Sequence, residues 1–195
     1  MLFDWRPKVF LCHVPLLSDS ERHGWFQKVL EVWASLGANV RILTPPPGVS
    51  PETFQVLRRQ IADREGGKFY ILADDDCLPL GDDFLAEGLS TLKAHPNFVQ
   101  LTPLPSNENI VEWTPSPTID NYTAYKDAEV FEHVSVGGIR FSRKMPFSLW
   151  PALVGTAPAY DGPHGEAIRQ EGFRVGYMRN VRFLHLGAGK STVWT

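Results

Sequence analysis

The chain has 195 residues, of which 43% are hydrophobic and 21% are charged, and its formal net charge is −3. These values are typical of one globular domain with a well-buried core, and the sequence contains no repeats, heptads or low-complexity tracts. No apolar stretch approaches the roughly 18–20 residues that a membrane span needs, and residues 5–8 interrupt the start too early for a signal peptide, so we expect neither.

The cysteines indicate the cellular compartment, and the distribution of charge indicates the kind of ligand. Cys12 and Cys77 are too few for a secreted disulfide framework, and without a CxxC pair no zinc site is predicted. We therefore expect the protein to be located in the cytoplasm, or in the cytoplasm of a host cell if the protein is viral. Residues 131–195 carry eight Lys or Arg against four Asp or Glu, and this basic closing third suits a diphosphate or a polyanionic acceptor.

The first half of the chain alternates between strand and helix patterns. Strands are predicted where short apolar runs end at Pro, Gly or polar clusters, at residues 8–14, 39–44, 69–73 and 97–101. Helices are predicted where apolar residues recur every three to four positions between capping and stop signals, at residues 18–37, 50–67 and 82–95. This alternation predicts an α/β fold with three layers and a mainly parallel central sheet.

The regular alternation of strand and helix patterns ends in the second half of the chain. Four prolines predict a long loop or a small excursion over residues 102–130. A strand at 131–136 is expected to run into Gly137 and Gly138 and to continue past this kink to residue 143. A helix is predicted from Asp161 to Ile168, and two short strands are predicted at 174–178 and 181–184. We expect one domain over residues 1–195.

Three consecutive carboxylates, Asp74, Asp75 and Asp76, directly follow the apolar run at 69–73, and residues 77–79 are expected to end the segment. The carboxyl ends of strands are where open α/β sheets bind ligands. Like charges crowded there repel one another unless a cation joins them. Mg²⁺ or Mn²⁺ is the natural partner for such oxygens and also binds substrate phosphates. The alternative is an acidic surface turn that caps the next helix.

Four features follow one another along the chain: the acidic triplet, the Gly137-Gly138 break, Asp161 at a helix start, and Leu184-His185-Leu186-Gly187. Over residues 8–187 this order resembles the GT-A type glycosyltransferases, particularly glycosyltransferase family 2. The resemblance implies a nucleotide-sugar-binding half at residues 1–101 and an acceptor and catalytic half at residues 102–195.

The resemblance also implies a role for each feature. Asp74, Asp76 and His185 would hold Mn²⁺ or Mg²⁺ against the diphosphate of the sugar donor, and Asp75 would contact the sugar or ribose. Gly137 and Gly138 would form the loop on the acceptor side, and Asp161 would act as the general base. Each part has a plainer alternative: a β-bulge or turn for the glycines, a helix N-cap for Asp161 and a packed core histidine for His185.

Basic residues that would assist phosphate binding are Arg58 and Lys190. Arg58, Arg59 and Arg64 belong to the helix before the acidic strand, where they either face the nucleotide or form a solvated face, and the solvated face is favoured. Lys190 lies in the segment 187–192, which fails as a P-loop because residue 184 is Leu and no helix follows. We expect this segment to be a flexible tail that closes over the donor diphosphate.

The implied activity is metal-dependent transfer of a sugar from a nucleotide-diphosphate donor to a hydroxyl group, with inversion. A UDP-sugar is favoured, although Thr44-Pro45-Pro46-Pro47 stands where the family has the acidic residue that reads uracil, so the base stays open. The acceptor is a glycan, a small molecule, a protein or a hydroxymethylated base in DNA.

Two other functions stay open. A nucleotidyltransferase that makes sugar nucleotides would need a glycine-rich basic loop after the first strand, and Val14-Pro15-Leu16-Leu17-Ser18 is not one. A non-catalytic module that binds the metal and the nucleotide sugar is the other alternative.

Overall fold

The computed structural model describes residues 7–14, 20–107, 129–132, 137–144 and 161–187. Its strands are β1 (Lys8–Cys12), β2 (Asn39–Leu43), β3 (Phe69–Asp74), β4 (Cys77–Leu80), β5 (Phe98–Pro105), β6 (Val130–Glu132), β7 (Arg140–Arg143) and β8 (Arg174–His185). Its helices are α1 (Ser20–Ser35), α2 (Pro51–Glu65), α3 (Phe84–Ala94) and α7 (Asp161–Gln170).

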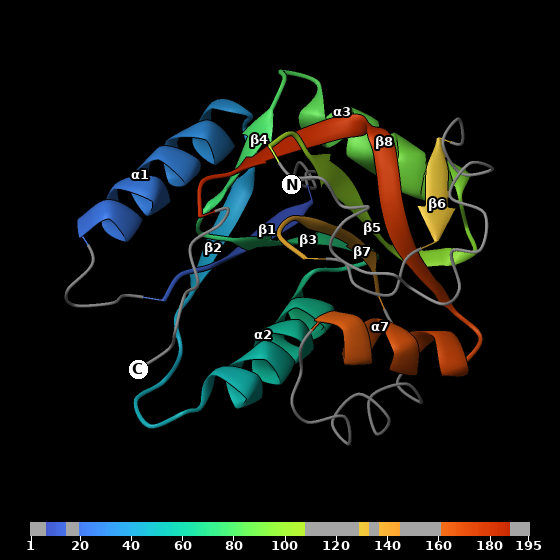
Figure 1. Ribbon diagram of the computed structural model, residues 1–195, viewed down its shortest axis with the longest axis horizontal. Helices are drawn as coiled ribbons and strands as arrows, with labels where there is room; N and C mark the ends of the chain where they lie inside the picture. Colours follow the sequence, from blue (N-terminus) through green and yellow to red (C-terminus); the bar gives the residue numbers. More distant parts are fainter. Residues whose placement is uncertain (1–6, 15–19, 108–128, 133–136, 145–160, 188–195) are drawn as a thin grey trace, which may run out of the picture.

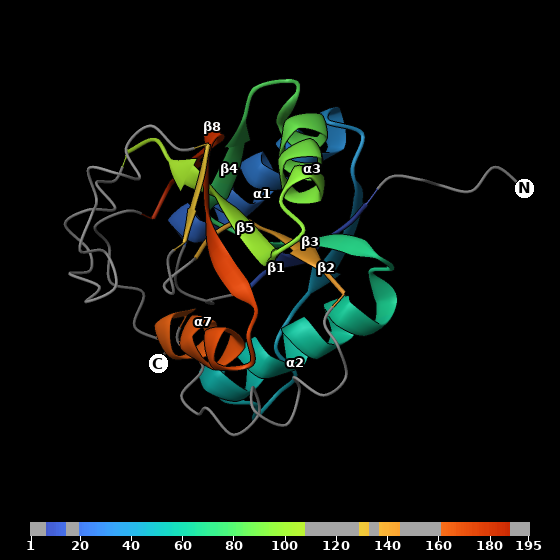
Figure 2. The same cartoon turned by 90° about the vertical axis from the view of Figure 1, so that its right-hand side faces the viewer.

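The strands form one sheet between two layers of helices (Figures 1 and 2). Helices α1 and α3 cover one face, and α2 and α7 cover the other. The strand order is β2-β1-β3-β7-β5-β8-β4, and β6 pairs with β8. The predicted three-layer α/β fold is confirmed. Among the described helices, none combines the length and the apolar character that crossing a membrane requires.

The pairings show how the strands are directed. β1 is parallel to β2 and β3, and β5 is parallel to β8. β7 is antiparallel to both β3 and β5, which gives the two parallel groups the same direction. Only β4, β6 and β7 run the other way among the described strands, so the expectation of a mainly parallel sheet is confirmed.

Several boundaries differ from the sequence prediction. Residues 77–80 form the edge strand β4 instead of ending the segment, and β5 extends through Pro103 to Pro105. β6 and β7 are separate strands with different partners, whereas the predicted pair at 174–178 and 181–184 is the single strand β8. These differences matter for function because β4 and the end of β8 lie side by side at the acidic triplet.

The core is divided by the sheet. On the α1 and α3 face, the fully buried Trp33, Phe84 and Phe141 rings pack against one another, with ring centroids 5.7 and 5.5 Å apart in the two adjacent pairs. On the other face, α2 and α7 cover two smaller apolar clusters centred on Phe10 and Ile168. The sheet is therefore packed on both faces, and its carboxyl edge rests on a close-packed core.

Candidate active site

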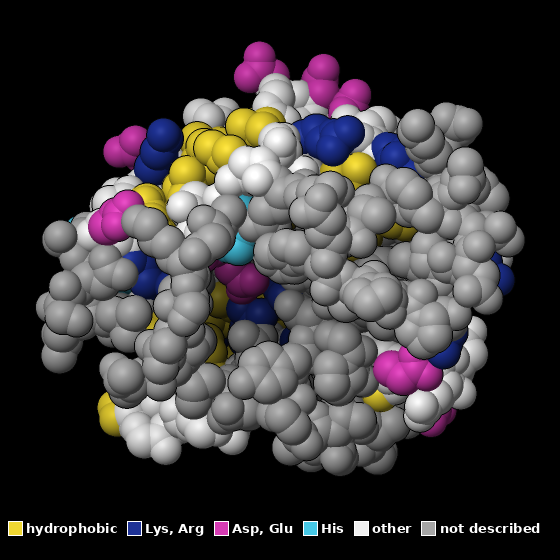
Figure 3. Space-filling model, in the orientation of Figure 1, with side chains coloured by type: hydrophobic (Ala, Val, Ile, Leu, Met, Phe, Trp, Pro, Cys, Tyr) yellow, Lys and Arg dark blue, Asp and Glu magenta, His cyan; other side chains and the backbone are white. Residues whose placement is uncertain are grey.

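The acidic triplet lies at the carboxyl edge of the sheet, as predicted. β3 ends at Asp74, which is level with Cys12, the last residue of β1. The chain then turns through Asp75 and Asp76 into β4. Figure 3 shows histidine, acidic and basic side chains gathered in a hollow on this side of the molecule. Asp75 is 0% and Asp76 7% exposed, so the alternative interpretation as a solvated surface turn is wrong.

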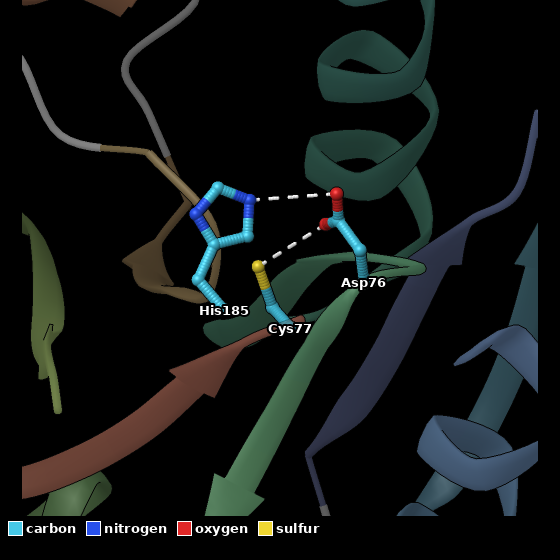
Figure 4. A group of neighbouring side chains, drawn as sticks. All are labelled: Asp76, Cys77 and His185. Carbon is cyan, nitrogen blue, oxygen red and sulfur yellow. Dashed lines mark hydrogen bonds and ion pairs between the residues drawn. The ribbon is translucent and has the colours of Figure 1, made fainter. Parts of the chain in front are cut away.

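Asp76, Cys77 and His185 form a compact group (Figure 4). The Oδ2 atom of Asp76 lies 3.4 Å from Nε2 of His185, and the Cys77 thiol donates to Oδ1 of the same carboxylate over 3.4 Å. Cys77 and His185 are directly opposite in the antiparallel β4–β8 pairing, which brings the start of one strand to the end of the other. Two of the three predicted metal ligands, Asp76 and His185, are therefore together.

Burial changes the acidity of the thiol in this group. The side chain of Cys77 is 1% exposed, and its burial together with the carboxylates of Asp76 and Asp74 raises its pKa well above the ordinary value. The thiol is therefore protonated at neutral pH unless a metal ion replaces the proton.

The backbone of this group is held from two sides. The Asn107 side chain donates to the carbonyl of His185 over 2.8 Å and accepts from its N–H over 3.0 Å. The N–H of Leu186 donates to the carbonyl of Asp76 over 2.7 Å. These contacts fix His185 relative to the turn that carries Asp76. Asn107 was not predicted from the sequence, because its only signal is an amide residue shortly after a strand.

Gly187 leaves space beside the carboxylate. A Cβ atom at this position would lie 2.8 Å from Oδ2 of Asp76 and 3.6 Å from Nε2 of His185. Both atoms are those that a metal would contact, so a glycine here keeps the open side of the pair free of a side chain.

Asp74 is not part of this group and is held by arginines instead. Arg58 donates to its Oδ1 atom, and Nη1 of Arg140 lies 3.5 Å from its Oδ2 atom. Burial alone would raise the pKa of Asp74, but the guanidinium groups of Arg58 and Arg140 outweigh it and hold the pKa well below the ordinary value. Each of its two oxygens thus faces a guanidinium group in this structure.

The predicted solvated face of α2 is wrong for two of its three arginines. Arg58 and Arg59 are 2% and 1% exposed, so a solvated face is wrong for both of them. Arg59 donates to the side chain of Gln100 on β5, over 3.3 Å. Arg64, whose side chain is 75% exposed and pairs with neighbouring Glu65, is the one that lies on a solvated face. Arg58 and Arg140 thus bring two buried positive charges to the carboxyl edge of β3.

The Asp74 contacts predict a pH dependence of stability. A carboxyl group whose native pKa is lowered stabilises the fold above its unfolded pKa of about 3.9 and loses this effect as the pH falls toward the native pKa. We expect Asp74→Asn to lower the free energy of unfolding at pH 7, and this difference from the wild type should shrink steadily below about pH 4. Urea unfolding of both proteins from pH 7 to pH 2.5 measures it. Glu31→Gln, an exposed change on α1, is the control; a difference that is constant with pH would contradict the expectation.

Asp75 is fully buried in a network of its own. One oxygen accepts from His13 Nδ1 at 2.7 Å and from the Val14 N–H at 3.1 Å, and the other accepts from Nη2 of Arg22 at 2.6 Å. The ring of His13 stacks on Phe26 with centroids 3.9 Å apart. Burial raises the pKa of Asp75, and the contacts with Arg22 and His13 offset only part of that effect. In this structure Asp75 positions the turn, and a sugar or ribose would reach it only after these contacts broke.

The Gly137-Gly138 segment lies beside the compact group. Gly138 has a φ of 75°, and a Cβ atom there would lie 2.8 Å from the Phe183 ring and 3.1 Å from the Cys77 sulfur. This positive φ is a backbone conformation that glycine adopts without strain. The close approach to Cys77 also places this loop next to the candidate site.

Gly138→Ala is expected to destabilise the protein by about 2–4 kcal/mol, because backbone strain and the collision with Phe183 add together. Gly172→Ala is the matched control: its φ is 84°, but a Cβ there meets nothing within 4 Å. The control should lose only about 1–2 kcal/mol. Urea unfolding compares the two, and equal losses would show that the approach to Phe183 and Cys77 is not tight.

Two predicted residues fall wholly or partly outside the described part of the chain. Helix α7 begins at Asp161, as predicted, but the side chain of this residue is not among those described. Lys190 lies beyond residue 187 and is also outside. The roles of both as general base and as phosphate-binding tail therefore stay predictions.

A pocket of about 420 Å³ lies at the opposite edge of the sheet. Its lining includes Lys8, Asn39 and Phe69, the first residues of β1, β2 and β3, and the Gly66-Gly67 turn. The amino ends of parallel strands are not where α/β sheets bind their substrates, and the carboxylates described above are at the other edge. The candidate active site is therefore the group around Asp76.

Comparison with solved structures identifies the fold. A protein from Desulfovibrio desulfuricans G20 described as a nucleotide-diphospho-sugar transferase superposes with a TM-score of 0.53 at 9% identity, over 94% of this chain and 88% of that one. A mutant of Drosophila beta-1,4-galactosyltransferase 7, in complex with manganese, UDP-Gal and xylobiose, gives 0.52 at 17% identity, over 97% and 76%. TarS of S. aureus, residues 1–349, gives 0.52 at 10% identity, over 91% and 59%.

Sequence comparison adds nothing to this likeness: no protein-family model and no curated protein sequence matches the chain. At these identities the structural likeness concerns the fold. The chain has the GT-A fold, which the resemblance of its motifs predicted.

Proposed function

We propose that the chain is a metal-dependent glycosyltransferase that moves a sugar from a nucleotide-diphosphate donor to a hydroxyl group. One observation carries the proposal: Asp76 and His185 converge to 3.4 Å at the carboxyl edge of a GT-A sheet. A carboxylate and an imidazole are both ligands for Mn²⁺, and Gly187 keeps the approach to them open. The residues present thus fit a divalent ion.

The charges around this pair suit a diphosphate. Arg58 and Arg140 meet at Asp74, so the edge of β3 carries two buried guanidinium groups and one carboxylate. Arginine binds phosphate oxygens through paired N–H donors. A bound divalent ion would supply further positive charge where the leaving diphosphate becomes negative. We infer that Asp76 and His185 hold the ion and that Asp74 orients the arginines. Asp74 would join the metal ligands only when the donor is bound.

The acceptor side is assigned by position in the chain. Asp161 at the start of α7 is proposed as the base that takes the proton from the attacking hydroxyl, and direct attack would invert the sugar carbon. The loop at Gly137 and Gly138, which approaches the Cys77 sulfur, is proposed to border the acceptor. A glycan or another small hydroxyl compound is the favoured acceptor, and a hydroxymethylated DNA base is the alternative.

A UDP-sugar with Mn²⁺ is the proposed donor pair, supported by the galactosyltransferase structure that contains manganese and UDP-Gal. In a panel of nucleotide sugars at one common concentration, only the correct donor should stabilise the protein. At about 100 times the dissociation constant of that donor the gain is about 2.7 kcal/mol, a rise in Tm of about 5–10 °C. The rise should require Mn²⁺ or Mg²⁺ and should fall with EDTA.

Catalysis is tested on the donor that the panel selects. Slow hydrolysis of that donor with Mn²⁺ should be lost in Asp161→Asn while donor binding is kept, because the base acts after binding. Hydrolysis that is equal in both proteins would remove Asp161 from the proposal. No stabilisation by any nucleotide sugar with either ion would contradict the function itself.

A further inference from the structure

The thiol of Cys77 lies close enough to the Asp76 and His185 pair to act with it. The nitrogen, oxygen and sulfur atoms that the three residues offer all lie within 4.8 Å of one another. The sulfur is 3.4 Å from Oδ1 of Asp76, and Oδ2 of Asp76 is 3.4 Å from His185. Because Cys77 and His185 are cross-strand partners, the pairing of β4 and β8 fixes their separation.

These distances match a tetrahedral metal site. Ligands bound at 2.0–2.3 Å to one tetrahedral ion stand roughly 3.3–3.8 Å from each other. The sulfur–Oδ1 and Nε2–Oδ2 distances, both 3.4 Å, fall in this interval, and the ligand atoms of the three residues lie within 4.8 Å of one another. Because these two distances involve different oxygens of Asp76, the carboxylate would turn so that one oxygen faces both partners around a single ion. Three protein ligands leave a fourth position for water or a substrate oxygen, as in catalytic zinc sites.

The three residues also differ in exposure in a way that suits ion binding. Cys77 is 1% exposed, whereas the side chains of Asp76 and His185 are 11% and 25% exposed. An ion would therefore meet the histidine and carboxylate first and the sulfur at the bottom of the site. Gly187 keeps the carboxylate accessible, and Gly138 lets the neighbouring loop pass close to the sulfur without a side chain.

The sulfur determines which ions the site prefers. Mg²⁺ takes oxygen ligands and does not recruit a thiolate, whereas Zn²⁺ and Co²⁺ bind sulfur, nitrogen and oxygen together. We propose that Cys77 is a third ligand for thiophilic divalent ions, so that Zn²⁺ or Co²⁺ binds Asp76, Cys77 and His185 as one set and displaces Mn²⁺. The thiol proton passes to the buffer as the metal–sulfur bond forms. The inference rests on the proposed function because it concerns the same metal site.

Cobalt absorption tests the sulfur bond directly. Titration of the full chain with Co²⁺ is expected to produce the near-ultraviolet charge-transfer band of a cobalt thiolate. Cys77→Ser should abolish this band. Cys12→Ser, which changes the other buried cysteine, is the matched control and should keep it. A band that survives Cys77→Ser, or that is lost only in Cys12→Ser, would overturn the proposal.

Zinc measurements on the unaltered chain remain decisive even if Cys77→Ser fails to fold. X-ray absorption of the Zn²⁺-loaded wild type should show one sulfur at about 2.3 Å besides nitrogen and oxygen neighbours at about 2.0–2.2 Å. A shell of nitrogen and oxygen alone would refute ligation by Cys77. Where Cys77→Ser folds, its Zn²⁺ affinity should fall on the order of 100-fold, with Mn²⁺ affinity changed much less.

The outcomes separate this inference from the proposed function. Sulfur ligation without stabilisation by any nucleotide sugar would leave the metal site in place and remove the transferase. Donor binding with Mn²⁺ but no sulfur shell with Zn²⁺ would keep the transferase and remove Cys77 as a ligand.

Discussion

Asp76→Asn is expected to weaken Mn²⁺-dependent binding of the nucleotide sugar at least about 100-fold, since even residues that only support metal ligands are worth 10- to 100-fold. Sugar transfer should fall further, on the order of 1000-fold, because the charge that stabilises the departing diphosphate is lost as well. The physical reason is the position of Asp76, whose oxygen lies 3.4 Å from His185 in the described site. Titration calorimetry with and without Mn²⁺ measures the binding.

Asp82→Asn is the matched control for this change. Asp82 is an exposed carboxylate six residues further along the chain, so the same loss of one negative charge should leave Mn²⁺-dependent binding unaffected. Equal weakening of binding in both variants would point to a general charge effect and would count against Asp76 as a metal ligand.

The second large effect is expected from Asp75, and it concerns stability. Asp75→Ala removes the carboxylate that Arg22 contacts at 2.6 Å, while the Arg22 side chain stays 90% buried. Removing one partner of a buried ion pair costs about 3–5 kcal/mol. For a domain of this size the Tm should fall by about 10 °C. Urea unfolding at pH 7 gives the free energy, and a loss below about 1 kcal/mol would be typical of an exposed pair instead.

A double variant distinguishes the cost of breaking the ion pair from the net contribution of the pair to stability. Because burial raises the pKa of Asp75, its charged form is itself costly, and the pair as a whole adds little over apolar side chains of similar size. Asp75→Leu combined with Arg22→Met is therefore expected to recover much of the stability that Asp75→Ala loses. If the double variant is as unstable as the two single losses added together, the two residues do not act as a pair.

The fold could be predicted largely from the sequence because its strands and helices follow strong local signals. Where the prediction was wrong, proline was the main reason. Pro79 is tolerated in β4 because β4 is at the edge of the sheet, where a missing N–H donor does no harm. Pro103 lies in β5 at the position where its register with β8 shifts, and such irregularities accommodate a residue that cannot donate.

The burial of Arg58 could have been predicted from its spacing along α2, although its charge favoured an exposed position. Phe54, Arg58 and Ala62 are spaced by four along α2, which puts them on one face of the helix. All three are at most 2% exposed. A charged residue in register with an apolar stripe is therefore expected to enter the interior, and Asp74 at the end of β3 explains how its charge is compensated there.

The candidate site could be predicted only in part. Asp76 and His185 were proposed from the order of motifs along the chain, and the structure places their side chains 3.4 Å apart. Cys77 and Asn107 did not, because their contacts with His185 depend on the register between β4 and β8 and on the path of the chain after β5. Register between strands far apart in sequence is set by the whole sheet and has no local signature.

A crystal structure of the chain with Mn²⁺ and UDP would show directly whether Asp76 and His185 hold the ion against the diphosphate. We expect the ion between Asp76, His185 and the two phosphates, with the guanidinium groups of Arg58 and Arg140 turned toward the same diphosphate. A nucleotide bound elsewhere, for example in the pocket at the amino ends of β1–β3, or an ion that contacts neither Asp76 nor His185, would rule out this metal and donor site.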